Sequence, residues 1–287
     1  MATGHARVGA VGHTPYYADD TIGNKHTGFH NSLYRGKYLG TSLTEAQSAA
    51  IQAGTFTDLF IGDYWTINGV NWRIAHFDPY YKCGSTSLDT HHIAVVPDTC
   101  LYSAKWNDTS DTSTGYVGSA IRTNIKAASG DAQGAEAKVI AAFGSSHVLS
   151  YKNYYPTTYS GQLATAWADT ACRVELMSEV EVYGCQVWGG TGYEVGESKQ
   201  QLALFKLAPE WVNIRADWWL RTVSTRAAGN AANVNENGNA NSNAASNSNG
   251  VRPISARCEP AGVIEPASER KEGLSRGIRK RTPEQST

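Results

Sequence analysis

The sequence contains little charge of either sign. Charged residues occupy 18% of the 287 positions and nearly cancel, which leaves a formal net charge of −1. A chain without a basic surplus has no electrostatic basis for binding nucleic acid or an anionic membrane surface. We therefore expect no nucleic-acid partner.

Long apolar runs are also missing. The longest runs, such as Ile93 to Pro97, are far shorter than the roughly 20 residues that cross a bilayer. The first residues, Met1 to Arg7, lack the apolar stretch of a secretory signal. These features predict a protein that is made in the cytoplasm and does not insert into a membrane.

Cysteine is scarce and odd in number, so any complete disulfide scheme leaves one thiol over. Without a secretory signal, the default expectation is reduced thiols that pack as small hydrophobes. The five cysteines are Cys83, Cys100, Cys172, Cys185 and Cys258.

Aromatic residues, by contrast, are abundant and unevenly placed. All eight tryptophans lie between Trp65 and Trp219, which predicts the main core in that interval. The length suits one large domain or two small ones. We expect an N-terminal arm with a short helix at residues 1–55, a folded domain at 56–256, and a disordered or accessory tail at 257–287.

The strongest local signal is a predicted β-hairpin around Asn68-Gly69, where both turn positions tolerate positive φ. In that register Trp65 opposes Trp72 and Ile67 opposes Val70. Four large apolar side chains would then share one face, which must be buried.

A short helix is expected before this hairpin. Ser42 and Glu45 have capping-box spacing, and Gly54 is a suitable C-terminal stop.

Further elements follow from apolar spacing. Residues 92–96 read as a buried strand, while 116–128 and 135–143 have helical periodicity. The apolar runs at 174–187 and 202–207 do not favour either type. Short strands, two helices and long irregular connections predict an α+β domain.

The region from 230 to 249 is dominated by asparagine, and six asparagines from Asn233 to Asn243 occupy every second position. In an extended chain this spacing places a row of amides on one surface. Burying such a row unpaired would be costly, so we expect it to face solvent or a ligand. The predicted ligand-binding residues are Asn230, Asn233, Asn235, Asn237, Asn239, Asn241, Asn243, Asn247 and Asn249.

Apolar and basic residues flank this asparagine tract (residues 230–249) on both sides, and we interpret them as its structural framework. Asp217 is a candidate to orient the guanidinium of Arg221, which otherwise pairs with a buried acid or a carbonyl. The alternative is that the tract is simply low-complexity and disordered. The framework residues are Trp218, Trp219, Arg221, Gly250 and Arg252.

This part of the sequence resembles the variable region of diversity-generating retroelement target proteins. The resemblance lies in Trp218-Trp219-Leu220-Arg221, the asparagine tract that follows, and then Gly250-Val251-Arg252-Pro253. In that family a reverse transcriptase miscopies adenines, so adenine-rich asparagine codons become many other codons but never stops. The hairpin and residues 106–119 and 180–184 also resemble phage-associated members. The resemblance covers roughly residues 56–256 and implies a C-type-lectin-like fold with a variable region at about 218–253.

The function implied by this resemblance is that of a phage tail protein that binds a host cell-surface receptor, either protein or glycan. The protein would be carried on the virion as a homo-oligomer, for which tropism determinants suggest a trimer. Two alternatives stay open: a phage decoration protein with a passive asparagine-rich loop, and an ordinary cytoplasmic protein.

An enzymatic reading has weaker support. The lectin-like fold is shared with formylglycine-generating enzymes, but Cys172 and Cys185 do not match their cysteine pair. Residues 190–199 are glycine-rich without the lysine spacing of a phosphate-binding loop. Adjacent His91 and His92 would point to opposite faces of a strand, which disfavours a shared metal. Residues 144–147 place serines near a histidine but lack a nucleophile elbow. We predict no catalytic residue, metal or cofactor.

Overall fold

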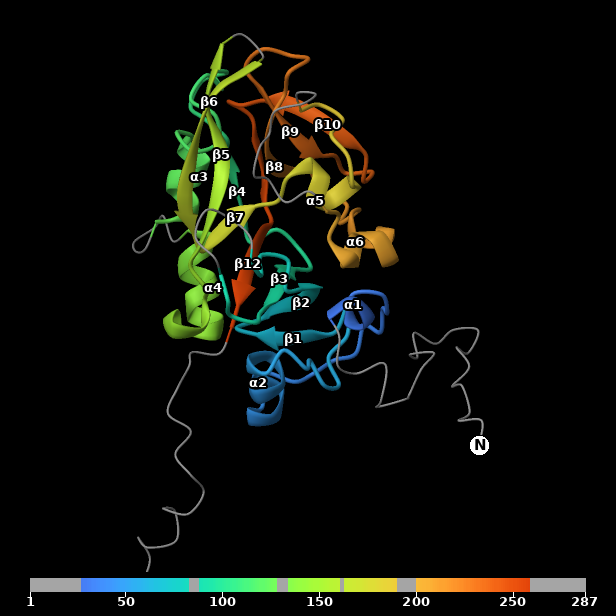
Figure 1. The fold of residues 1–287 in the computed structure, drawn as a ribbon. Coiled ribbons are helices and arrows are strands. Elements are labelled where there is room, and N and C mark those ends of the chain that lie inside the picture. The colour runs from blue at the N-terminus through green and yellow to red at the C-terminus, as the bar shows by residue number, and fades with distance from the viewer. Residues whose placement is uncertain (1–26, 83–87, 128–133, 161–162, 190–199, 259–287) are drawn as a thin grey trace, which may run out of the picture.

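The computed structural model describes residues 27–82, 88–127, 134–160, 163–189 and 200–258 (Figure 1). It contains two five-stranded sheets joined by one continuous apolar core. The first sheet is entirely antiparallel. Its strands, in spatial order, are β1 (Tyr64–Ile67), β2 (Val70–Phe77), β3 (Ile93–Pro97), β12 (Pro253–Arg257) and β7 (Val174–Leu176).

The second sheet contains the asparagine tract. It is mixed, because one pair of neighbouring strands, β8 (Trp218–Val223) and β11 (Ser248–Val251), runs parallel and the other pairs run antiparallel. We call it the display sheet. Its strands, in spatial order, are β10 (Ala240–Ala244), β9 (Asn230–Val234), β8 (Trp218–Val223), β11 (Ser248–Val251) and β4 (Tyr102–Lys105).

A long two-stranded ribbon and several short helices complete the described structure, so the predicted α+β class is confirmed. No described helix is long and apolar enough to cross a membrane. The ribbon consists of β5 (Tyr151–Ser160) and β6 (Leu163–Cys172). The helices are α1 (Thr27–His30), α2 (Glu45–Gln52), α3 (Ala120–Ile125), α4 (Ala135–Phe143), α5 (Glu179–Tyr183) and α6 (Ala203–Leu207), with 3-10 turns at Ser145–His147 and Pro209–Trp211.

The predicted hairpin is confirmed in its register and in its turn. Asn68 and Gly69 have φ values of 51° and 75°, which is the backbone that this dipeptide favours. Trp65 faces Trp72 across the strands, and both indoles are buried. The hairpin therefore supplies two of the largest side chains in the core.

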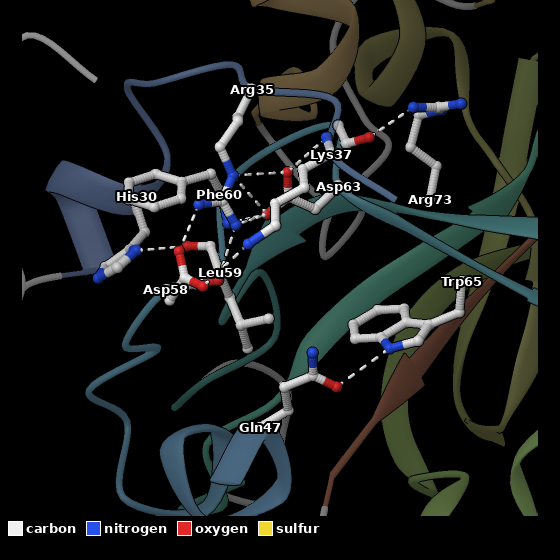
Figure 2. Close-up of polar contacts among 11 residues, drawn as sticks. His30, Arg35, Lys37, Gln47, Asp58, Leu59, Phe60, Asp63, Trp65 and Arg73 are labelled. Carbon is white, nitrogen blue, oxygen red and sulfur yellow. Dashed lines mark hydrogen bonds and ion pairs between the residues drawn. The ribbon is translucent and has the colours of Figure 1, made fainter. Parts of the chain in front are cut away.

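The helix predicted before the hairpin is present, but its cap differs from the expected one. Thr44, not Ser42, is the N-cap: its hydroxyl accepts from the Gln47 amide, and the Gln47 side chain accepts from the Thr44 amide. The same Gln47 oxygen accepts from Trp65 Nε1 at 3.2 Å (Figure 2). Thr44 and Gln47 have the same capping-box spacing as Ser42 and Glu45, so local spacing permits both caps, and the contact with the hairpin favours the later one.

The remaining elements match the bounds predicted from the sequence to different degrees. Helix α4 has the predicted bounds, 135–143. Helix α3 is shorter than predicted because Ser119 caps it and accepts from Arg122 N. Tyr116, which carried part of the helical periodicity, instead lies in the preceding turn, where its hydroxyl accepts from Leu176 N at 3.1 Å. The 174–187 run contains both a strand, β7, and a helix, α5.

The described part of the N-terminal arm packs on the first sheet. Residues 34–40 run beside residues 61–64 through two isolated parallel bridges, one from Tyr34 to Ile61 and one from Tyr38 to Tyr64 of β1. Arg35 fastens this segment through ion pairs to Asp58 and Asp63, the latter at 2.6 Å (Figure 2). At the other end of the described chain, residues after Cys258 lie outside the described structure.

Tryptophans form much of the core in the interval expected from their positions. Five indoles are almost fully buried, and they come from both sheets and the loop after β4. This shared core joins the display sheet to the hairpin. The five are Trp65, Trp72, Trp106, Trp218 and Trp219.

Candidate binding surface

The asparagine tract forms a regular β-hairpin, β9 and β10, closed by a turn at residues 235–239. The asparagines themselves shape this turn. The Asn235 side-chain oxygen accepts from the backbone amides of Asn237 and Asn239 at 3.0 and 2.9 Å. Gly238, with φ of 84°, occupies the left-handed position. The tract is therefore ordered by its own side chains as well as by its strand pairing.

This fold-back corrects the expected single row of amides. Asn233 on β9 lies opposite Asn241 on β10, so these two share a face with Asn243. Asn235, Asn237 and Asn239 belong to the turn instead. The every-second spacing is real, but the chain reverses in its middle. The Asn237-Gly238 dipeptide is the sequence signal that could have located this reversal.

Exposure divides the nine asparagines into two groups. Asn233 and Asn249 are buried, contrary to the expectation that the row faces solvent. Asn233 is covered because it lies next to Trp219 inside the sheet, and Asn249 sits on β11 between β8 and β4. The other seven form what we call the outward asparagines: Asn230, Asn235, Asn237, Asn239, Asn241, Asn243 and Asn247, all exposed or half-buried.

Each buried amide lacks one hydrogen bond among the described residues. Asn233 donates to the Val234 carbonyl at 3.3 Å, while its own side-chain oxygen has no partner there. The side-chain nitrogen of Asn249 is similarly unpaired within the described structure. Such orphaned groups cost roughly 1–3 kcal/mol each. Asparagine at these two positions is therefore not favoured by stability.

Two tryptophans support the tract from opposite faces of β8, since adjacent strand residues point to opposite sides. Both indoles are fully buried. Trp218 Nε1 donates to the Val212 carbonyl at 3.3 Å, and Trp219 Nε1 donates to the Ala104 carbonyl at 2.9 Å. The strand beneath the tract is thus held on both faces.

Arg221 forms a buried ion pair with a residue that sequence reasoning did not identify. Its Nη1 donates to Glu181 Oε2 at 2.5 Å and to the Leu176 carbonyl at 2.7 Å. Asp217, the expected partner, instead accepts from the Glu236 amide at 2.8 Å and so holds the tract's turn. Glu181 also closes a capping box with Ser178 at the start of α5.

Arg252 is buried where the two sheets meet, and carbonyls and rings surround its guanidinium. It donates to the Pro97 carbonyl at 2.9 Å and to the Trp211 carbonyl at 2.7 Å. The guanidinium also lies 5.1 Å from the centroid of the Trp218 ring. Burial lowers the pKa of Arg252 to about 10, so the side chain remains charged at neutral pH. We interpret Arg252 as a structural cation.

Gly250 meets a steric requirement. Its amide donates to the Asp217 carbonyl at 2.9 Å, and a Cβ at this position would lie 2.2 Å from the sulfur of Cys100. No other residue fits without movement of β11 or of the Cys100 loop.

The β9–β10 hairpin is fastened at both ends. At the turn, the Tyr183 hydroxyl donates to the Gly238 carbonyl at 3.1 Å. At the other end, the Ala245 amide donates to the Gly229 carbonyl, and the Ala245 carbonyl accepts from Asn107, both at 2.9 Å. In these contacts and in the Glu236–Asp217 bond, the tract contributes four atoms: the Gly238 carbonyl oxygen, the Ala245 nitrogen and carbonyl oxygen, and the Glu236 nitrogen. All four are backbone atoms. The clamps therefore do not depend on which side chains the outward positions carry.

A buried carboxylate anchors the segment that precedes residues 190–199. The Glu179 side chain accepts from the consecutive amides of Val187, Trp188 and Gly189, at 3.1, 3.0 and 2.9 Å. The glycine-rich residues 190–199 themselves lie outside the described residues.

The candidate catalytic and metal groups do not converge. His91 Nδ1 and the His92 backbone amide both bond to the Asp78 carboxylate. The ring nitrogens of His92 have other partners, since Nδ1 contacts the Thr90 carbonyl and Nε2 accepts from the Tyr80 amide. No group of three metal-ligating side chains occurs within the described ranges. In the Ser145–His147 turn, Ser145 accepts hydrogen bonds from Arg173.

Four cysteines are described, and all four are free thiols. Burial raises the pKa of Cys172 to about 12, so this thiol stays protonated at neutral pH. It contacts the Tyr155 hydroxyl and the Tyr151 carbonyl at 3.6 and 3.5 Å. Cys185 is exposed and unpaired, and Cys83 falls outside the described ranges. The described thiols form no disulfide.

Comparison with known proteins adds one match. The profile of a family described as a domain of unknown function, DUF6273, matches residues 134–255. The matched range begins at the N-cap of α4 and includes the asparagine tract, Arg221 and its partner Glu181. No curated protein and no solved structure matches the chain. The match covers less than half of the chain and carries no activity.

Proposed function

We propose that this protein is a ligand-binding protein whose asparagine tract is a diversified contact surface. One observation carries the proposal: the tract is an ordered hairpin with seven outward asparagines, held by backbone atoms on a buried frame. Apart from Asn235, whose side chain accepts two hydrogen bonds in the turn, the outward side chains can change without loss of the backbone contacts that hold the hairpin. This separation of frame and surface is what a diversified binding site requires.

Rigidity of the frame supports affinity as well as tolerance. A surface that is ordered before binding loses less conformational entropy when a ligand docks. The buried pair between Arg221 and Glu181 and the two flanking tryptophans supply that order beneath the tract. Amide side chains add donors and acceptors at the contact.

The finer assignment rests on the resemblance to retroelement target proteins. It comprises a C-type-lectin-like fold, a place on a phage tail, and a host cell-surface receptor as the ligand. Single contacts on a small polar surface are weak, so several copies would be needed for avidity. We infer a homo-oligomer with cyclic symmetry, for which a trimer is the expected form.

Genomic sequencing tests the diversification. A near-repeat of the segment encoding residues 230–249 is expected close by, differing only at adenines and accompanied by a reverse-transcriptase gene. A locus without such a repeat would favour the decoration protein with a passive tract.

A library experiment tests binding directly. The seven outward positions are randomised, the variants are displayed on yeast, and binders are selected against lysozyme as a neutral protein probe. A control library randomises exposed positions of α2 and α4. The proposal expects folded binders from the first library only. Equal yields from both libraries would contradict it.

A further inference from the structure

The outermost strand of the display sheet has a free edge. In the described part of the chain, β10 pairs with β9 only (Figure 1). At the turn, the Asn235 amide donates to the Asn239 carbonyl, and at the opposite end the Ala245 amide donates to the Gly229 carbonyl. Bonded and non-bonded pairs alternate along an antiparallel ladder. These two bonds therefore fix which backbone groups point inward and which point outward.

The alternation assigns the inward bonds to Asn241 and Asn243, which lie opposite Asn233 and Ala231. It follows that Ala240 and Ser242 direct their N–H and C=O groups away from the sheet. Ala244 directs its N–H group away as well, but its carbonyl already accepts from the Asn247 amide at 2.9 Å. These three residues form what we call the open edge.

The open edge lacks the features that normally block strand addition. Charged side chains, prolines and bulges serve that purpose in natural sheets. From residue 237 to 251 the sequence contains no charged residue and no proline. The β9–β10 register runs without a shift. The side chains of β10 are alanine, serine and asparagine, which are small enough for close backbone approach.

The edge is also held in place before any partner arrives. Tyr183 and Asp217 fasten the turn, and Asn107 fastens the far end through the Ala245 carbonyl. A further contact joins Ser246 Oγ and Ser110 Oγ at 3.0 Å. A strand added here would therefore not have to order its template.

We propose that the open edge of β10 receives an extended strand of a polypeptide ligand. The N–H and C=O groups of Ala240 and Ser242 and the N–H of Ala244 would pair with the ligand backbone, while Asn241 and Asn243 contact its side chains. In this binding mode the main chain supplies affinity and the side chains supply specificity. The inference rests on the proposed function and narrows its ligand to a protein with an exposed extended segment.

This mode suits a diversified surface, because backbone pairing does not change when the side chains of the tract change. A second copy of the chain is a less suitable occupant. A five-residue strand is roughly 17 Å long, and two copies joined by this pairing alone would bury far less than the roughly 1,000 Å² of a stable dimer, whereas a ligand segment can extend past the strand onto the outward asparagines of the turn.

Hydrogen exchange of the full chain, followed by NMR, tests whether the edge is free. The amides of Ala240, Ser242 and Ala244 should exchange fast, those of Asn241 and Asn243 slowly, and neither should depend on protein concentration. Protection of the first three at every concentration would show that the edge is already covered. Protection that grows with concentration would show self-pairing, and either result overturns the proposal.

Binding is tested with peptides selected from a random-peptide library on the immobilised protein. Ser242→Pro removes an outward N–H at an edge position that proline can occupy. Ser242→Ala, the matched control, removes the same hydroxyl and keeps the N–H. Loss of one or two backbone bonds should weaken selected peptides by about tenfold or more in the proline variant, with no change in the alanine control.

A second arm leaves the protein unaltered, so it does not depend on the folding of the proline variant. Peptides N-methylated at alternate residues should lose binding in one methylation phase and keep it in the other. Equal binding in both phases would overturn strand addition.

The two proposals fail differently. Peptides that require the outward asparagines but ignore Ser242→Pro would refute the open edge and leave the binding surface intact. Peptides whose affinity and sequence preference both stay the same after all seven outward asparagines become serine would refute the surface itself.

Discussion

Removal of the Arg221 guanidinium should destabilise the display sheet strongly. Its side chain is 1% exposed and that of Glu181 is fully buried, so water cannot replace either partner. Arg221→Met keeps the apolar stem but leaves the Glu181 carboxylate buried without its cation. Breaking such a pair from one side costs about 3–5 kcal/mol. The lost bond to the Leu176 carbonyl adds about 1 kcal/mol.

Glu181→Gln provides the compensating change. Glutamine is also suited to the third helical position of a capping box, so the bond to the Ser178 amide can survive. Because this substitution removes the uncompensated charge, the double variant should recover about 1–3 kcal/mol relative to Arg221→Met alone. Recovery would locate the penalty in charge burial, not in lost packing.

Urea unfolding followed by tryptophan fluorescence measures these free energies, and Arg226→Met serves as an exposed control expected within about 0.5 kcal/mol of the parent. The reasoning fails if Arg221→Met costs less than about 1 kcal/mol, or if Glu181→Gln deepens the loss instead of reducing it.

Three further outcomes are expected. Trp72→Ala should cost roughly 3–5 kcal/mol in thermal unfolding, because it empties the core under the hairpin, and a negligible change would remove the hairpin from the core. In a saturation scan, outward positions such as Asn241 should accept diverse side chains with changes in the free energy of unfolding within about ±0.5 kcal/mol. Large or charged residues should prevent folding at the buried positions Asn233 and Asn249. Uniform tolerance across all nine asparagines would contradict the burial pattern. In the folded chain, burial lowers the pKa of His76 from 6.5 to about 4, and its Nδ1 accepts from the Ala203 amide. As the pH falls, this histidine is therefore protonated in the unfolded chain before it is protonated in the folded chain. Stability should therefore fall as pH drops from 6.5 towards 4, and urea titrations should show a shallower fall in His76→Gln.

Elements with a strong local cause were predictable from the sequence. Asn68-Gly69 selects the hairpin turn through its positive φ values, and the flanking apolar alternation fixes its register. Helix α4 has the predicted bounds because Gly134 and Gly144 interrupt the chain at both ends. In both cases the controlling interactions lie within a few residues of one another.

The short helices were less predictable, since their ends depend on distant partners. Local spacing permits a capping box at Ser42–Glu45 or at Thr44–Gln47, and the second, in which Gln47 also accepts from Trp65, is the one that forms. Tyr116 leaves the helical pattern because its hydroxyl is held by β7. Local periodicity carries no information about such contacts.

For the candidate surface, the residue pattern alone establishes that a polar tract lies between apolar anchors, and that its amides recur at every second position. Which amides face outward depends on the tertiary structure. Asn233 and Asn249 have the same side chain as Asn237, yet they are buried because β9 and β11 lie inside the sheet, where Asn233 is paired with Trp219 of β8. The tertiary structure also pairs Arg221 with Glu181, forty positions away, and assigns nearby Asp217 to the backbone of Glu236. Burial and ion pairing arise from contacts between residues distant in the chain, and the order of residues does not encode them locally.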